Sequence, residues 1–299
     1  MPEPEPVPSP ETPDLFSTPS TSTNGASANG HGPDREEEKL RLGGMALRNG
    51  LLIHGPTSWG AAARAADGSI AVASGPKPNF GGNLLAKVPV VRGPLRMAEA
   101  FAVIPIARYN LRAARLPFED LRVIAAALAT TLVSAAVRGR RSDGEISPVR
   151  EALSAVLGLT PAIVALGSSE LAAYHAVEHK SIGGYEQGKD AAEVPKEHQR
   201  CGSNLIIPML VFSVAGQLIV NRLVERPGRL EQSLSGVAGL SLSVETFVHA
   251  DRHPDSPLGR AVHFGGDAIQ RLFATREPTS EQMEIGAAAL EAVLAAERG

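Results

Sequence analysis

Four long apolar runs follow one another through the middle of the chain. They cover residues 123–137, 153–169, 205–220 and 234–248. The first three contain no charged residue, whereas the fourth contains Ser, Gly and Glu245. A helix needs ~20 apolar residues to span a bilayer, with a lower limit near ~17, so each run reaches that length only with its flanks. The succession of runs, with arginines and other polar residues at their ends, favours insertion into a membrane over buried helices in a soluble all-α domain.

Different patterns flank these runs. Residues 1–40 are rich in Pro, Ser, Thr, Gly and Glu. We expect them to form a disordered tail, because they cannot bury enough apolar surface to offset the ordering entropy. The tail lacks the basic segment and apolar core of a signal peptide. Residues 41–92 are expected to form a small β-rich unit, in which Asp67-Gly68 between two short apolar stretches marks a hairpin turn.

Residues 251–299 are expected to form a soluble C-terminal segment that ends in a helix. Thr279 and Gln282 have the spacing of a capping box. The apolar residues that follow recur on one face of a helix, and they are Met283, Ala287, Leu290 and Leu294. The expected fold is therefore mainly α. It is a membrane-associated bundle of about four apolar helices over residues 93–250, with a small N-terminal β-rich unit and a C-terminal amphipathic helix.

Composition and charge narrow the function classes. The formal net charge is −3 and no long basic or acidic run follows residue 40, which gives no support for binding to nucleic acid. Cys201 is the sole cysteine, so an internal disulfide framework is excluded. If all four runs span, both termini and the segment 170–204 lie on one side of the cell membrane. Without a signal peptide, that side is expected to be the cytoplasm.

The segment 170–204 carries candidate chemistry between two of the apolar runs. His175, Glu178 and His179 form an H-x-x-E-H pattern. On a helix, two histidines four residues apart project from one face, and their imidazoles reach one metal ion. Glu178 is then placed to act as the general base on a water, which is the role of the glutamate in H-x-x-E-H metalloproteases.

A metal site needs more ligands than two histidines. Glu186, His198 and Cys201 follow in the same segment, and they are the candidates for the rest of the ligand set. Gly183-Gly184 is expected to turn the chain after the helix and to bring Glu186 back toward the histidines. Because a thiolate ligand favours zinc over magnesium or calcium, the expected cofactor is a divalent metal, zinc.

Several charged residues of this segment and its cysteine also have interpretations that involve no chemistry. Lys180 and Arg200 are candidates for binding an anionic substrate or a lipid headgroup, but such cations are more often solvated or snorkelling charges. Glu186 is also typical of a solvated acid, and Cys201 of a small buried hydrophobic residue.

The stretches HAVEHKSIGGYEQG and HQRCGSN resemble the signature of the YqhQ-like family. Its members are uncharacterised bacterial membrane proteins that are described as predicted metal-dependent enzymes. The positions that match are His175, Glu178, His179, Lys180, Tyr185, Glu186, His198, Arg200, Cys201 and Gly202. The resemblance extends over residues 42–295 and includes GGMALRNGLLIHGP near the start and QRLFATREPTSEQMEIGAAAL near the end. It implies a membrane location and a metal site.

The chain departs from the family at three positions. Met45, Asn49 and His54 stand where the family has Gln, Glu and Arg. These departures imply a different specificity, or a loss of activity with the metal site kept.

Two functions remain open. The leading hypothesis is a membrane-embedded metal-dependent hydrolase. The alternative is a non-catalytic scaffold or accessory protein with a structural metal, which a closed four-ligand site of His175, His179, His198 and Cys201 would favour. The predicted partners are the lipid bilayer and a substrate whose class stays open, as does the oligomeric state.

Overall fold

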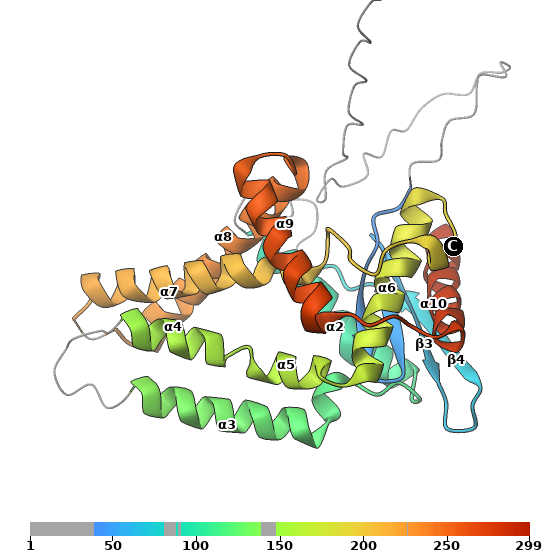
Figure 1. The fold of residues 1–299 in the computed structure, drawn as a ribbon, viewed down its shortest axis with the longest axis horizontal. Helices are drawn as coiled ribbons and strands as arrows, with labels where there is room; N and C mark the ends of the chain where they lie inside the picture. Colours follow the sequence, from blue (N-terminus) through green and yellow to red (C-terminus); the bar gives the residue numbers. More distant parts are fainter. Residues whose placement is uncertain (1–38, 81–87, 89–90, 139–147, 226) are drawn as a thin grey trace, which may run out of the picture.

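The computed structural model describes residues 39–80, 88, 91–138, 148–225 and 227–299 (Figure 1). The predicted disordered tail therefore lies, apart from its last two residues, outside the described residues.

The N-terminal part folds as an antiparallel meander. Its strands are β1 (Gly43–Leu47), β2 (Gly50–His54), β3 (Ser58–Arg64) and β4 (Ile70–Pro76). They lie in the sheet in the order in which they occur in the chain. Gly68 joins β3 to β4 with a φ of +85°, a conformation that glycine adopts at no steric cost. Both the β-rich character of this region and its Asp67-Gly68 turn are thus confirmed.

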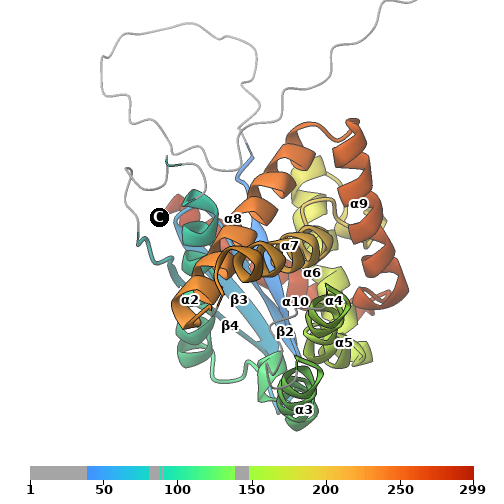
Figure 2. The same cartoon turned by 90° about the vertical axis from the view of Figure 1, so that its left-hand side faces the viewer.

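Helices cover both faces of this sheet (Figures 1 and 2). They are α2 (Arg92–Asn110), α6 (Ser169–Gln187) and α10 (Ser280–Arg298). Side chains alternate along a strand, so Leu51 and Ile53 of β2 pack with α6 and α10, whereas Leu52 packs with α2 on the other face. We call this assembly of β1–β4, α2, α6 and α10 the sheet unit.

A second group of helices extends away from the sheet unit to one side (Figure 1). We call it the helical arm, and its members are α3 (Leu121–Arg138), α4 (Pro148–Leu157), α5 (Thr160–Leu166), α7 (Ile206–Leu223) and α8 (Arg229–Arg252). Short elements join the two groups: η1 (Pro117–Glu119), η2 (Ala191–Glu193), η3 (Gly202–Leu205), α9 (Pro257–Ile269) and η4 (Gln270–Ala274). The mainly helical fold predicted for the chain is therefore present.

The helical arm exposes most of its apolar side chains. No side chain of α3 that the structure describes is buried, and Leu128 and Leu132 are 63% and 72% exposed. Among the described residues, Val149–Leu166 and Gly202–Leu223 are long and apolar enough to cross a membrane, and Leu121–Val137 is apolar but shorter. Two of the four predicted spans thus meet this test of length and composition, which gives weak support for membrane association.

The apolar run at 153–169 is not one helix. It is divided between α4, which ends at Leu157, and α5, which begins at Thr160. Pro161 lies in the first turn of α5, where its missing N–H and fixed φ are tolerated. The run therefore includes a break between two helices that its apolar pattern alone does not reveal.

Candidate metal centre

The two histidines of the H-x-x-E-H pattern lie on the buried part of α6. Most residues of this helix from Leu171 to Gly184 are buried, because α6 packs on the sheet and on α10. His175 and His179 stand four residues apart, and their ring centroids are 4.4 Å from one another. One face of α6 thus presents two adjacent imidazoles, as the spacing predicts.

The predicted turn at Gly183-Gly184 is wrong. The helix continues through both glycines to Gln187, and Gly188, with a φ of +65°, forms its C-cap. A Cβ on Gly183 would lie 2.8 Å from the Val194 side chain, and one on Gly184 would lie 3.0 Å from the Ala191 backbone. The two glycines therefore serve close packing of the following chain against α6, and not a change in its direction.

Three potential ligand atoms converge at this face. His175, His179 and Cys201 each offer one such atom, and these atoms all lie within 4.8 Å of one another. Cys201 reaches the histidines from the residue before η3, and its Sγ is 3.4 Å from His175 Nε2. Two imidazole nitrogens and one thiol are a ligand set that suits zinc.

The other nitrogen of each imidazole faces a backbone carbonyl. His175 Nδ1 is 2.8 Å from the oxygen of Ala274, and His179 Nδ1 is 2.6 Å from the oxygen of Lys196. Since a carbonyl only accepts, each Nδ1 is the protonated nitrogen and each Nε2 keeps its lone pair. This is the arrangement that orients metal-ligating histidines.

His179 Nε2 supplies an independent indication of a missing partner. It is buried, and it has no hydrogen-bond partner among the described residues. Burial lowers the pKa of this imidazole, and the nearby Cys201 thiol raises it by less. The lowered pKa favours the neutral imidazole, which is the form that ligates a metal, and the residues present fit a zinc ion.

Glu178 is a buried carboxyl beside this cluster. Desolvation raises its pKa, while the nearby His175 and His198 lower it less. Gly44 of β1 makes room for the side chain, because a Cβ at that position would lie 2.9 Å from Glu178 Cγ. A carboxyl with a raised pKa is suited to accept and release a proton near neutral pH.

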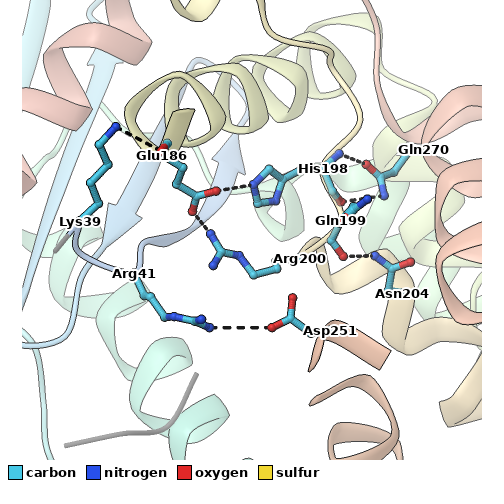
Figure 3. Close-up of polar contacts among 9 residues, drawn as sticks. All are labelled: Lys39, Arg41, Glu186, His198, Gln199, Arg200, Asn204, Asp251 and Gln270. Atoms are coloured by element: carbon cyan, nitrogen blue, oxygen red, sulfur yellow. Dashed lines mark hydrogen bonds and ion pairs between the residues drawn. The ribbon is translucent and has the colours of Figure 1, made fainter. Parts of the chain in front are cut away.

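Glu186 and His198 lie next to the cluster but contact each other (Figure 3). His198 Nε2 is 3.2 Å from Glu186 Oε2, and Arg200 forms an ion pair with the same carboxylate. The His198 ring centroid is 5.6 Å from that of His179. The structure thus gathers three of the five predicted ligands at one point, and it places the other two in a neighbouring ion-pair network.

Gln270 and Asn204 hold the chain that carries Cys201 (Figure 3). Gln270 has no exposed surface; its Oε1 accepts from His198 N at 2.8 Å, and its Nε2 donates to Ser203 Oγ at 2.9 Å. Asn204 Nδ2 donates to the oxygen of Gln199 at 2.5 Å. Both residues were absent from the predicted site, although Gln270 opens the QRLFATREPT stretch that resembles the family.

The π-helical segment η4 has two roles at the site. It carries Gln270 at its start and Ala274, the carbonyl partner of His175, at its end. Single π turns are frequent at functional sites. One short segment thus orients a histidine and holds the loop of the cysteine.

The ammonium group of Lys180, a predicted substrate-binding residue, is bonded within the protein. Nζ donates to the carbonyl oxygens of Ala192 at 3.1 Å and Val194 at 2.9 Å, and it pairs with Glu277 at 3.0 Å. These contacts use all three ammonium donors. Lys180 therefore fastens η2 to α6, and its binding of a substrate stays a prediction.

The three positions that depart from the family pattern have different surroundings. Asn49 closes the β1–β2 turn through hydrogen bonds to Arg64 and Ala113. Met45 packs at the edge of the α2 side of the sheet. Burial lowers the pKa of His54 to about 4, and the charge of Lys77 adds to this effect.

Comparison with known proteins gives one match. A family model described as "Protein of unknown function (DUF1385)" matches residues 168–296, a range that begins just before α6 and ends within α10. The chain is similar to this family over the part that contains every residue of the His175, His179 and Cys201 cluster. Searches of curated proteins and of solved structures found no match.

Proposed function

We propose that this chain is a membrane protein that binds one zinc ion through His175, His179 and Cys201 and acts as a hydrolase. One observation carries the proposal: three ligand atoms meet within 4.8 Å, and both imidazoles are oriented by backbone carbonyls. Three protein ligands are typical of catalytic zinc, because a fourth position remains open for water or substrate. A zinc ion bound there would supply Lewis acidity at that open position.

Glu178 is the proposed general base. Its carboxylate takes a proton from the attacking water and returns it to the leaving group. The raised pKa assists both steps, because it brings the carboxyl closer to the working pH. Arg200, held by Glu186, is the remaining candidate for orienting an anionic group of the substrate.

The membrane part of the proposal rests on the helical arm. Large apolar side chains of α3, α4 and α7 are exposed together, and a contiguous apolar surface is typical of a site that contacts a membrane or a partner. Two segments have span length, and the resemblance to the YqhQ-like family points the same way. α3 leads away from the sheet unit and α4–α5 leads back, so the site and the sheet unit would share one side of the membrane (Figure 1). We propose that this side is the cytoplasm.

The alternative is a scaffold with a structural metal. The His198 ring lies close enough to His179 for a small shift to supply a fourth ligand. X-ray absorption at the zinc edge separates the two functions: an enzyme requires three protein ligands and one oxygen from solvent, and a scaffold requires four protein ligands.

Metal content tests the site directly. Purified without chelators in detergent, the wild-type protein is expected to contain about one equivalent of zinc. The double variant His175→Ala/His179→Ala should contain none. The matched control is His249→Ala/His253→Ala, which removes another pair of stacked histidines at the C-terminal end of α8. Equal metal in all three proteins, or none in the wild type, would refute the site.

Activity then tests the role of Glu178. Glu178→Gln keeps the size of the side chain but removes its basicity, so the variant should keep its zinc and lose hydrolysis. Retained hydrolysis in this variant would exclude Glu178 as the base.

A further inference from the structure

The helix α9 has one buried face and one exposed apolar face. Val262, His263 and Gly266 face inward; the last packs on Asn204 next to the cysteine loop. On the outer side, an apolar stripe recurs at spacings of three and four residues and continues into η4. It consists of Leu258, Ala261, Phe264 and Ala268 of α9 and Leu272 of η4. Phe264 is 74% exposed and Leu272 is 80% exposed. This stripe has no function in the metal centre.

Cations lie along one edge of the stripe. Arg260 and Arg271 are exposed on the flank between the stripe and the buried face, together with the half-buried Asp267. Arg276, also exposed, follows just after η4. None of these arginines pairs with an acid that the structure describes. An apolar stripe beside unpaired arginines is typical of helices that lie in the interface of an anionic membrane.

The position of α9 fits such a surface. Gly265 packs against Ile207 Cδ1, in the first turn of α7, so α9 lies level with the end of the segment Gly202–Leu223. Figures 1 and 2 both show α9 running across the direction of the helical arm. If the arm crosses a bilayer, α9 lies parallel to the membrane plane at the depth where the hydrocarbon ends.

We propose that α9 is an interfacial helix, whose stripe enters the headgroup region of an anionic bilayer while its inner face supports the Cys201 loop. This inference rests on the proposed membrane location of the helical arm. It places the metal centre beside the headgroups, on the aqueous side of the membrane. A substrate whose reactive group lies at the headgroup level would then reach the site while its apolar part stays in the bilayer.

Lipid quenching of tryptophan fluorescence tests this placement. The native chain has one tryptophan, Trp59, which is fully buried in the sheet unit and serves as the baseline. The full chain carrying Phe264→Trp is reconstituted into vesicles of phosphatidylcholine and phosphatidylglycerol, with bromine placed near the headgroup or near the chain end. We expect Phe264→Trp to be quenched by the shallow bromines more than by the deep ones, with Leu272→Trp behaving alike.

Two control positions separate this inference from the membrane proposal. Val211→Trp lies on the exposed face of α7 and should be quenched by deep bromines, whereas Ala295→Trp on α10 should not be quenched by either. Quenching of Val211→Trp without quenching of Phe264→Trp would overturn the interfacial helix and leave the membrane proposal intact. An unquenched Val211→Trp would overturn both.

The remaining outcomes test whether α9 binds anionic lipid specifically, rather than adhering to any surface or to a second copy of the chain. Reversing the charges of the flank with Arg260→Glu/Arg271→Glu should reduce quenching of Phe264→Trp by roughly half or more in anionic vesicles, and leave it unchanged in neutral ones. Equal quenching of Ala295→Trp would indicate general adhesion and contradict the proposal. A blue shift of Phe264→Trp that grows with protein concentration but without bromine quenching would show that a second copy covers the stripe, which also contradicts it.

Discussion

In the sheet unit, Leu51 and Ile53 have no exposed surface, whereas Leu128 and Leu132 of α3 are mostly exposed. Both regions are built from ordinary aliphatic side chains, so composition does not separate them. The difference lies in partners: β2 is covered by α6 and α10, while α3 presents its apolar side chains outward. An apolar side chain stabilises a fold only where something removes it from water, and for the helical arm we propose that the bilayer does so.

Truncation of single aliphatic side chains should give the largest contrast between the regions. Ile53→Ala leaves a cavity in a closed core and should lower the free energy of unfolding by about 2–5 kcal/mol. Leu128→Ala removes no protein contact of that kind and should change it by less than about 0.5 kcal/mol. Denaturation in detergent is followed by Trp59 fluorescence for the sheet unit and by far-ultraviolet circular dichroism for the helices of both regions. Equal losses for the two variants would show that the arm also has a packed protein core.

A charge in the helical arm sharpens the comparison. Leu128→Arg places a guanidinium near the middle of α3, which should disfavour insertion by about 3 kcal/mol if α3 lies in a bilayer. The matched control is Tyr109→Arg, on α2 of the sheet unit, where the side chain is 79% exposed against 63% for Leu128. The fraction of protein that resists alkaline extraction from membranes measures insertion. Similar fractions for both variants would place α3 in water.

Local signals in the sequence account for much of the fold. Asp67-Gly68 and the Thr279–Gln282 pair are decided by residues within one turn of each other, and both are present as predicted. The apolar runs likewise lie on helices. The break inside 153–169 was missed, because an apolar pattern does not distinguish one helix from two in line.

The composition of the site is harder to predict from the sequence than the turns and caps, because tertiary contacts decide which residues meet there. His175 and His179 are paired by helix geometry, so their spacing predicted their proximity. Glu186 and His198 are equally suitable ligand types, but the fold pairs them with each other. Gln270 lies far along the chain from the segment it supports, and no local pattern connects a buried amide to a loop so distant in sequence.

Gln270 of η4 is hydrogen-bonded to the chain that carries Cys201, on either side of the cysteine. Its loss should weaken the binding of zinc. Gln270→Ala removes the hydrogen bonds that hold the Cys201 loop, so the affinity for zinc should fall about 10–100-fold, as for other residues that support metal ligands. Competition with a chelating dye measures the affinity, and the absorption band of the cobalt-substituted protein reports the thiolate. Gln217→Ala on α7 is the control. An unchanged affinity and spectrum would show that the loop holds its position without this residue.

The smallest expected effect comes from the start of α10 in the sheet unit, which has a capping box, compared with the start of α5 in the helical arm, which has none. Thr279 caps α10 through its hydroxyl, and Gln282 completes the capping box from the side chain. Thr279→Ala should therefore lower the stability of the sheet unit by about 1 kcal/mol, which Trp59 fluorescence would report as an earlier unfolding midpoint. The control is Thr160→Ala in α5, whose cap is Leu159 and has no side-chain hydrogen bond. If both variants lose the same stability, the cap of α10 contributes nothing beyond helix propensity. If only Thr279→Ala loses it, the hydrogen bonds of the capping box stabilise α10 and, through it, the sheet unit that α10 covers.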